Sequence, residues 1–465
     1  MTKALVWLRN DLRLSDNPAL AAACKAGAAV AIYVHEEGPG PRPIGGAARW
    51  WLHQSLTAMA GQLAKIGIPL HVKTGSAKAI LTQKLAETGA TEIHWNRRYA
   101  PAAREIDAEI KQSLRQQSIA VTSHPGNVLA EPWTIMTVQD KPYSVFTPFW
   151  NNLKTHDIAR PLPAPEGTAI PLEPVDTNYR QPLWAQKLEQ YWSVGEAAAQ
   201  AALENFLDQN LIAYPQGRDF PGRNLTSHLS PNLRFGEISP RQIWHAAQAR
   251  AHVEPQMAGA VEKFLSELAW RDFSYHQLNH RTDIAQRPMQ AKYEALQWRN
   301  APAQLRAWQG GQTGFPIIDA GMRELWETGY MHNRVRMLVA SLLTKNLLID
   351  WRQGEAWFWD CLVDADEANN PASWQWVAGS GLDAAPYFRI FNPVTQGERF
   401  DEVGDYVRRW VPELAGLPDK WLHTPANAPE SVLEQARVTL DKTYPRPIID
   451  LKSSRQQALD AVSGL

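Results

Sequence analysis

A helical pattern between residues 264 and 278 combines a carboxylate, an indole and a guanidinium on one face. In FLSELAWRDFSYHQL, Glu267, Trp270, Arg271 and Ser274 recur every three or four residues, which places them side by side on a helix. Such a face can stack on a flat ring and hydrogen-bond its edge. A surface Glu–Arg pair beside a core tryptophan would produce the same spacing, so this segment alone leaves both interpretations open.

A second helical segment predicts polar groups that face a cavity or a partner. In YMHNRVRMLVASLL (residues 330–343), Asn333, Arg336 and Met337 fall within one turn, and the helix then becomes apolar. A helix this apolar is buried, and polar groups that are buried need partners. The first turn therefore marks a candidate binding surface.

Two further segments concentrate polar and aromatic side chains. In TSHLSPNLRFGEIS (residues 226–239), hydroxyl side chains cluster where a helix would start. That arrangement fits either an anion site or an ordinary helix cap. The segment CLVDADEANNPASWQWVAGSGLDAAPYFRIFNP (residues 361–393) gathers carboxylates, amides, indoles and a guanidinium, notably Asp364, Asp366, Asn370, Trp374, Trp376 and Arg389.

The composition is that of a globular protein with almost no overall charge. The chain has 465 residues, of which 44% are hydrophobic and 20% are charged, and its formal net charge is −1. This length predicts two or three domains, each with its own core. Because no global field attracts the chain to nucleic acid or membrane, an anionic partner must meet a local basic patch.

Cysteine usage and the N-terminus predict the compartment. The two cysteines, Cys24 and Cys361, lie far apart in the sequence, which favours a reducing compartment and excludes a disulfide framework or a thiolate metal site. The charged N-terminus does not resemble a signal peptide, and no run approaches the ~20 apolar residues of a membrane span. We therefore expect a cytoplasmic protein that binds no metal.

The order of predicted elements divides the chain into an α/β front and a helical back. Residues 1–125 alternate short apolar runs with helical patterns, which predicts a Rossmann-like parallel five-stranded sheet with crossover helices. Residues 126–195 are rich in proline and predict a linker. Residues 196–465 carry helical patterns. Neither GxGxxG nor GxxxxGK[ST] is present, so the α/β part lacks the usual phosphate-binding signatures.

These segments, together with LVWLRNDLRLSDNPAL at the N-terminus, resemble the photolyase/cryptochrome flavoproteins over nearly the whole chain. The resemblance implies an α/β antenna domain at 1–125, an interdomain linker at 126–195, and a larger all-α domain at 196–465 that binds FAD and DNA. It also implies light-driven electron transfer to a damaged base pair.

The resemblance assigns roles around the flavin. Asp364 and Asp366 hydrogen-bond the flavin ring and the adenine side of the cofactor, and Arg336 is the charge partner of Asp364. Asn370 faces flavin N5, where a neutral amide suits the fully reduced anion; a carboxylate would instead supply a proton. The other expected FAD contacts are Tyr214, Thr226, Ser227, Leu229 and Ser230.

Three tryptophans match the positions of the family's electron path from flavin to surface. They are Trp374, Trp351 and Trp298. An indole can lose and regain an electron, and short hops outrun one long tunnelling step. Core packing alone would also explain buried tryptophans.

The substrates implied by the resemblance are crosslinked pyrimidines in UV-damaged DNA. Glu267 with Trp270 matches the cyclobutane-dimer type: the carboxyl hydrogen-bonds the thymine edge and stabilises charge. Trp270 and Trp376 form the walls of the dimer pocket. The other expected substrate or DNA contacts are Asn333 and Met337 at the dimer, and Arg271, Arg334, Arg389 and Gln396 toward DNA.

A second, light-harvesting chromophore of the folate type is also expected. The best-known folate pattern has a glutamate where Ala103 stands here. ARWWLHQSL (residues 48–56) instead resembles plant-cryptochrome-like bacterial photolyases, so Trp50 or Trp51 would stack on a pterin. Core packing explains both indoles equally well, and a deazaflavin, a flavin or an empty site stay open.

Three functions compete. The first is light-driven repair of cyclobutane pyrimidine dimers, and the second is a blue-light sensor or a (6-4) photolyase. The third, a light-independent nucleotide-binding protein, fails on the absent phosphate motifs. Asn370, Glu267 with Trp270, and the lack of a long C-terminal tail favour the first, and Asn333 after His332 disfavours the (6-4) type. We expect a monomer that acts on damaged DNA and does not enter a membrane.

Overall fold

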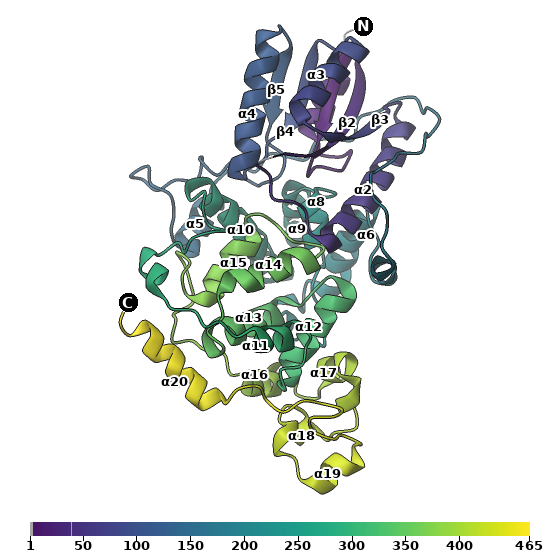
Figure 1. The fold of residues 1–465 in the computed structure, drawn as a ribbon. Helices are drawn as coiled ribbons and strands as arrows, with labels where there is room; N and C mark the ends of the chain where they lie inside the picture. The colour runs from purple at the N-terminus through teal and green to yellow at the C-terminus, as the bar shows by residue number, and fades with distance from the viewer. Residues whose placement is uncertain (1–2, 39) are drawn as a thin grey trace. The chain divides into compact units, whose positions relative to one another are not determined.

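The computed structural model describes residues 3–38 and 40–465, which form two compact units (Figure 1). The first unit comprises Met1–Ile212 and Ser227–Thr282, and the second comprises Ala213–Thr226 and Asp283–Leu465. Among the described residues, no helix has the length and apolar character needed to cross a membrane.

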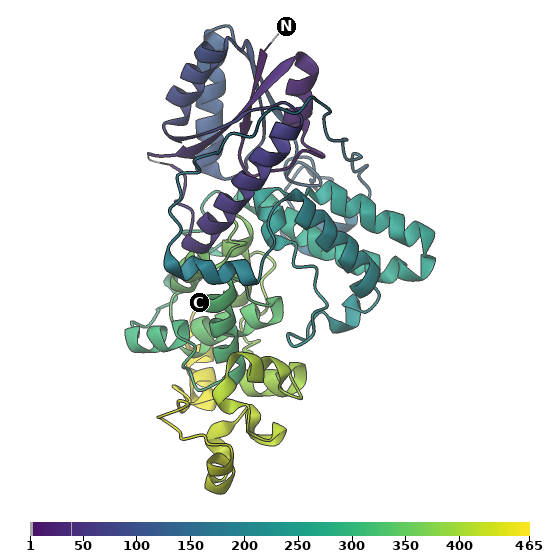
Figure 2. The same ribbon diagram turned by 90° about the vertical axis from the view of Figure 1, so that its right-hand side faces the viewer.

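A parallel five-stranded sheet opens the first unit, as predicted. The strands lie in the order β3-β2-β1-β4-β5, and helices flank the sheet (Figure 2). Their bounds are β1 Lys3–Leu8, β2 Ala28–Glu36, β3 Leu70–Gly75, β4 Glu92–Asn96 and β5 Ala120–His124. The central strand β1 is buried from its second residue onward, because crossover helices cover both faces of such a sheet. The crossover helices are α1 Pro18–Ala26, α2 Gly46–Lys65, α3 Ala77–Thr88 and α4 Pro101–Gln116.

The first unit continues with helices that follow the sheet. They are α5 Phe146–Leu153, α6 Glu196–Asn205, α8 Ser230–Phe235, α9 Pro240–Val253 and α10 Ala258–His280. Helix α5 and a 3-10 helix at Leu183–Gln190 lie within the proline-rich segment that we expected to be a linker. The eight residues of α5 are too few to show a helical period in the sequence, but Phe149 and Trp150 anchor the helix by burial.

The second unit is helical. Its longer helices are α12 Pro316–Thr328, α13 Asn333–Ser341, α14 Trp351–Cys361, α15 Asn369–Ala378 and α20 Leu451–Val462; the shorter ones include α7 Tyr214–Gly217, α11 Pro302–Gln309, α16 Pro393–Phe400, α17 Asp405–Trp410, α18 Asp419–Leu422 and α19 Glu430–Gln435. One apolar core joins α11 through α15. Helix α13 does not run on regularly, since Leu342–Asn346 form a π-helical turn, η5.

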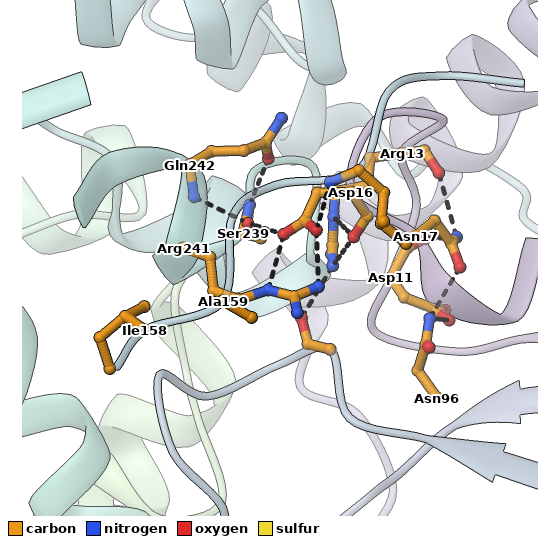
Figure 3. Close-up of polar contacts among 12 residues, drawn as sticks. Asp11, Arg13, Asp16, Asn17, Asn96, Ile158, Ala159, Ser239, Arg241 and Gln242 are labelled. Carbon is orange, nitrogen blue, oxygen red and sulfur yellow. Dashed lines mark hydrogen bonds and ion pairs between the residues drawn. The ribbon is translucent and has the colours of Figure 1, made fainter. Parts of the chain in front are cut away.

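A buried carboxylate fastens the loop after β1 to helix α9 within the first unit (Figure 3). Asp16 has no exposed surface. It accepts hydrogen bonds from Arg241 Nε at 3.0 Å and Arg241 Nη2 at 2.5 Å, and another from Ser239 Oγ at 2.5 Å. Arg13 lies next to this pair and donates to the carbonyl oxygens of Asp16, Gly126 and Gly236. The cluster therefore satisfies two buried guanidinium groups with one carboxylate and several carbonyls.

Side chains of the protein fill the place where sheets of this type usually bind a ligand. The strand order reverses between β1 and β4, and ligands bind at that switch point in open α/β sheets. Here Asn96, at the end of β4, donates through Nδ2 to Asp11 Oδ2 at 2.7 Å and to Asn17 Oδ1 at 2.8 Å. All three side chains are at most 1% exposed. This interior network explains why no glycine-rich phosphate loop follows β1.

Asp16→Asn should destabilise the first unit strongly. The change leaves the buried Arg241 guanidinium without its carboxylate and removes the negative charge beside Arg13, and breaking a buried pair from one side costs about 3–5 kcal/mol. Denaturant unfolding of the parent and the variant measures this effect. Glu109→Gln is the matched control, because Glu109 pairs with Lys78 in the same unit but is 66% exposed, and its loss should cost less than about 1 kcal/mol. Equal losses in both variants would contradict a structural role for the buried pair.

Candidate functional site

A partly buried ion pair joins helix α13 to the segment between α14 and α15 in the second unit. Arg336 Nη2 lies 2.9 Å from Asp364 Oδ2, and Arg336 Nε donates to the carbonyl oxygen of Met331 at 2.7 Å. Burial by itself would lower the pKa of the Arg336 guanidinium, but Asp364, together with Tyr330 and Glu324, outweighs this effect and holds that pKa above its usual value. The pair offers a donor and an acceptor to a polar ring.

Asp366 organises the start of α15. Its Oδ1 accepts from the backbone N–H groups of Ala368 at 2.9 Å and Asn369 at 2.8 Å, and from Asn369 Nδ2 at 2.8 Å. The carboxylate thus satisfies N–H groups that a helix leaves without partners at its N-terminus. This contact fixes the turn that carries Asp364 and leads into Asn370.

The orientation of the Asn370 amide is set by Glu355 on α14. Asn370 Nδ2 donates to Glu355 Oε1 at 2.8 Å and to the Glu355 carbonyl oxygen at 3.1 Å. A carboxylate and a carbonyl can only accept, so the nitrogen must face Glu355. The amide therefore presents Oδ1 to any other group. Sequence analysis missed Glu355, although a charged residue that is 3% exposed inside an aromatic helix was an available signal.

The tryptophans of the expected electron path lie in the core and at its margin. Trp374 is buried, and its ring lies over the backbone of Gly354, where an added Cβ would stand 2.1 Å from Trp374 Cη2. Trp351 is the first residue of α14, the helix that contains Gly354, and it is 1% exposed. Trp298 is partly buried and packs against the core. Trp374 also meets the buried Trp308 edge to face, with ring centroids 6.2 Å apart.

The remaining expected cofactor contacts divide between the units. Tyr214 is buried on α7, and Thr226 hydrogen-bonds the side chain of Tyr330; both belong to the second unit. The first unit holds Ser227, Leu229 and Ser230, with Leu229 buried and Ser230 exposed at the start of α8.

The expected DNA contacts of the second unit differ in how far they are already engaged. Arg334 Nη2 lies 2.9 Å from Asp219 Oδ2, and its guanidinium covers the ring of Phe400. Arg389 is exposed in the segment before α16. The other members are Asn333, which is exposed, and Met337, Trp376 and Gln396, which are partly buried.

Helix α10 presents Glu267, Trp270 and Arg271 in the first unit. Glu267 Oε1 lies 2.8 Å from Lys263 Nζ. Trp270 stacks on Phe146 of α5, with centroids 3.9 Å apart and planes at 9°. Arg271 donates to the carbonyl oxygen of Asn127 at 2.6 Å. Phe146, absent from the sequence prediction, thus fixes the plane of the Trp270 ring.

The residues considered for a folate lie inside the first unit. Trp50 and Trp51 are at most 1% exposed, and the Trp51 indole N–H donates to Glu237 Oε1 at 3.2 Å. Trp51 also packs against Trp192 and Phe235. Ala103 is buried on α4. In the structure both indoles act as core side chains.

Comparison with known proteins decides the family. Residues 4–166 match the family described as DNA photolyase, and residues 264–464 match the FAD binding domain of DNA photolyase. The chain is 46% identical to a deoxyribodipyrimidine photo-lyase of Agrobacterium fabrum, over 99% of this chain and 98% of that protein. The chain belongs to the photolyase/cryptochrome family.

Two further relatives of the family show its range. Cryptochrome-1 of Arabidopsis thaliana is 36% identical over 99% of this chain and 70% of that protein. The crystal structure of a bacterial class III photolyase from Agrobacterium tumefaciens superposes with a TM-score of 0.95 at 45% identity, covering 100% of this chain and 98% of that one. The family therefore includes both named repair enzymes and named cryptochromes among close relatives of this chain.

The second-unit residues fit the FAD that the matched photolyase domain implies. A flavin ring offers alternating donors and acceptors along its edge. Arg336 supplies N–H donors, Asp364 supplies carboxylate oxygens, and Asn370 presents Oδ1. Side chains that carry both functions within one buried cluster match such an edge.

Asn370→Asp should create a carboxyl pair that holds a proton. Asn370 Nδ2 lies 2.8 Å from Glu355 Oε1, and two carboxylates that close do not both ionise, so the pKa of the pair rises. A raised pKa in the folded state gives full stability below the unfolded pKa of about 4, and stability falls as the pH rises through the raised value. Unfolding midpoints of parent and variant between about pH 4 and pH 8 measure the difference. With flavin bound, the retained proton should produce a broad red absorption band under illumination that the parent lacks.

The control is Glu355→Gln in the Asn370→Asp background, which removes the second carboxyl. Its stability should lose the added dependence on pH. If Asn370→Asp followed the parent at every pH, the contact between the two side chains would be wrong.

Proposed function

We propose that the protein is a deoxyribodipyrimidine photo-lyase that repairs cyclobutane pyrimidine dimers in UV-damaged DNA. The observation that carries this proposal is the full-length likeness to an Agrobacterium protein of that name. The reaction is light-driven electron transfer from photoexcited reduced FAD to a flipped-out dimer. Photolyases are among the enzymes that extrude their target from the duplex, and a damaged base costs least to extrude.

Within this proposal, Arg336, Asp364 and Asn370 hold and tune the cofactor. When bound, FAD supplies the electron that splits the dimer. Arg336 and Asp364 orient the ring edge, and Asp366 fixes the turn between them and Asn370. Asn370 presents a neutral oxygen because Glu355 takes both amide hydrogens. A neutral group brings no proton to N5, so the fully reduced anion is favoured.

Glu267 and Trp270 are the proposed contacts with the dimer. The Glu267 carboxyl hydrogen-bonds the thymine edge and stabilises charge there, which requires it to exchange its partner Lys263 for the base. Trp270, stacked on Phe146, offers a ring with a fixed plane as one apolar wall. Asn333, Met337 and Trp376 are the other proposed pocket residues.

The proposed phosphate contacts are Arg271, Arg334, Arg389 and Gln396. Such contacts position the protein on DNA without reading sequence. Arg334 would have to leave Asp219, and Arg271 would have to leave a backbone carbonyl. Arg389 has no ion pair to a carboxylate in the described parts of the chain, which makes it the most available of the three.

A second chromophore of the folate type stays part of the proposal, in the α/β domain at 1–125. The sequence resemblance of residues 48–56 supports it. Because the indoles of Trp50 and Trp51 are covered by protein, the pterin would contact other residues. We also infer a cytoplasmic, monomeric enzyme, with residues 126–195 as the link to the helical domain at 196–465.

A blue-light sensor is the second candidate function. The likeness to Cryptochrome-1 over 99% of this chain favours it. A sensor signals through a partner and need not split dimers. Repair activity therefore separates the two functions.

The first test is dimer splitting. We expect the protein with reduced FAD to restore thymine monomers from cyclobutane dimers under blue or near-ultraviolet light and not in the dark, as measured by chromatography of the DNA. Glu267→Ala should lower the yield several-fold while FAD content stays unchanged, because the charge-stabilising group is lost. Glu262→Ala is the matched control, since Glu262 lies on the same helix and is 60% exposed beside Lys154. No repair under light would leave the sensor as the function.

The second test concerns the electron path. Trp298→Phe should block photoreduction of oxidised flavin by external donors, because phenylalanine does not give up an electron as indole does. Repair by chemically reduced protein should persist, since that reaction does not use the path. Trp326→Phe is the control: Trp326 is 59% exposed and stacks on Trp357 instead. Unchanged photoreduction in Trp298→Phe would assign the electron to another branch, with Trp308 beside Trp374 as the first candidate.

A further inference from the structure

Lys345 is a fully buried lysine in the second unit. It lies on the π-helical turn η5 and has no exposed surface. Its Nζ donates to the carbonyl oxygen of Arg389 at 2.9 Å and lies 5.2 Å from the centroid of the Tyr387 ring. A buried ammonium group is costly unless hydrogen bonds compensate it. A cation kept at such a position calls for a role beyond packing.

Residues 382–392, here called the Arg389 loop, are anchored on their inner side. Tyr387 is buried in a cluster with Tyr293, Leu348 and Ala458. The backbone N–H of Arg389 donates to the Pro386 carbonyl at 2.8 Å, which forms a tight turn. The loop thus has an interior face fixed by packing and by the bond to Lys345.

The outer side of the Arg389 loop points to solvent. Phe388 is 68% exposed, and Arg389 is exposed as well. Lys345 therefore holds the main chain of a residue whose side chain is exposed. The backbone of Phe391 is tied in the same way, since its N–H donates to Ser341 Oγ at 3.2 Å.

The π-helical turn places the ammonium group. Single π-turns interrupt α-helices at functional positions more often than elsewhere. The neighbouring Asn346 Nδ2 donates to Ser454 Oγ of α20 at 2.9 Å, so the C-terminal helix braces the turn. Burial, with a further contribution from Arg389, lowers the pKa of Lys345 to about 8, and the group still carries its charge at neutral pH.

We propose that Lys345 is a positioning residue that holds the Arg389 loop in the form that contacts DNA phosphate. This inference rests on the proposed function, because Arg389 is a DNA contact only if the protein acts on DNA. The hydrogen bond fixes the backbone at Arg389, and so limits the positions that its guanidinium can reach. A preformed contact loses less entropy when DNA binds.

Limited trypsin digestion tests the anchor without any assay of activity. Trypsin cleaves after Arg389, and the cleavage rate follows the local opening of the loop. Lys345→Met keeps the volume and removes the donor, and cleavage should become about tenfold faster or more, since a hydrogen bond from a charged donor is lost. Mass spectrometry of the fragment that ends at Arg389 gives the rate.

Two variants serve as matched controls. Lys292→Met removes a lysine that also lies over a tyrosine ring, at 5.0 Å from Tyr293, but Lys292 is exposed. Tyr387→Phe removes a buried hydroxyl that has no hydrogen-bond partner in the described structure. Both should be cleaved at the parental rate. The flavin spectrum and FAD content should be unchanged in all three variants, which shows that they fold.

A double-mutant cycle on DNA binding tests the link to Arg389. Lys345→Met and Arg389→Ala should each weaken binding of dimer-containing DNA. The double variant should bind no more weakly than Arg389→Ala alone, because Lys345 acts through the residue already removed. Additive losses would overturn the positioning role.

The two proposals fail in different ways. Absence of light-dependent repair by the parent would overturn the proposed function. Intact repair together with equal trypsin rates in the parent and Lys345→Met would overturn only the role of Lys345.

Discussion

The requirement that every buried charge has a partner governs the second unit. Arg336 and Asp364 neutralise each other between α13 and the segment before α15. Glu355 is satisfied by Asn370, and in consequence it orients the amide. Removing Asp364 would leave the Arg336 guanidinium without its carboxylate, at a cost of several kcal/mol. Removing the Glu355 carboxyl would leave the Asn370 amide only the Glu355 backbone carbonyl oxygen as acceptor. The side chains that we propose as contacts of the flavin ring are therefore the same ones that hold these helices together.

In the first unit, too, buried charges are paired, but there the paired groups close on one another. Asp16, Arg241 and Arg13 form a closed polar cluster beside the loop after β1 (Figure 3). Asn96 and its partners occupy the switch point of the sheet. In a dinucleotide-binding sheet that position is left open for the ligand. Here the polar groups satisfy one another, and no phosphate loop follows β1.

The sequence predicts those parts of the fold whose pattern lies within one helix or strand. Strands such as β1 and the long helix α10 have clear periodicity, and the predicted parallel sheet and helical remainder are confirmed. Helix α5 is too short to show a period. The π-turn η5 leaves no distinct signal in the sequence, because the α-helical pattern continues through residues 342–346. The assignments of individual site residues stay predictions, because they came from motif resemblance.

Contacts distant in sequence account for what was missed. Glu355 and Asn370 are fifteen positions apart, and Phe146 and Trp270 belong to separate helices. Neither pairing follows from spacing along one element. Even so, Glu355 and Lys345 each left a trace: a charged residue within an otherwise apolar or aromatic run. Such a residue must be paired, because the interior does not tolerate an isolated charge.

The near-zero net charge gives these pairings a functional meaning. With a formal charge of −1, the chain cannot rely on a global field to gather DNA. Several arginines form ion pairs within the protein: Arg241 with Asp16, Arg336 with Asp364, and Arg334 with Asp219. A guanidinium offered to phosphate must then be held outward by groups beneath it. An arginine that makes no ion pair within the protein can bind phosphate more effectively when its backbone is fixed, because phosphate contacts depend on geometry as well as on charge. In the role proposed for Lys345, its buried ammonium fixes the backbone of Arg389 through the carbonyl oxygen, while the guanidinium of Arg389 remains exposed.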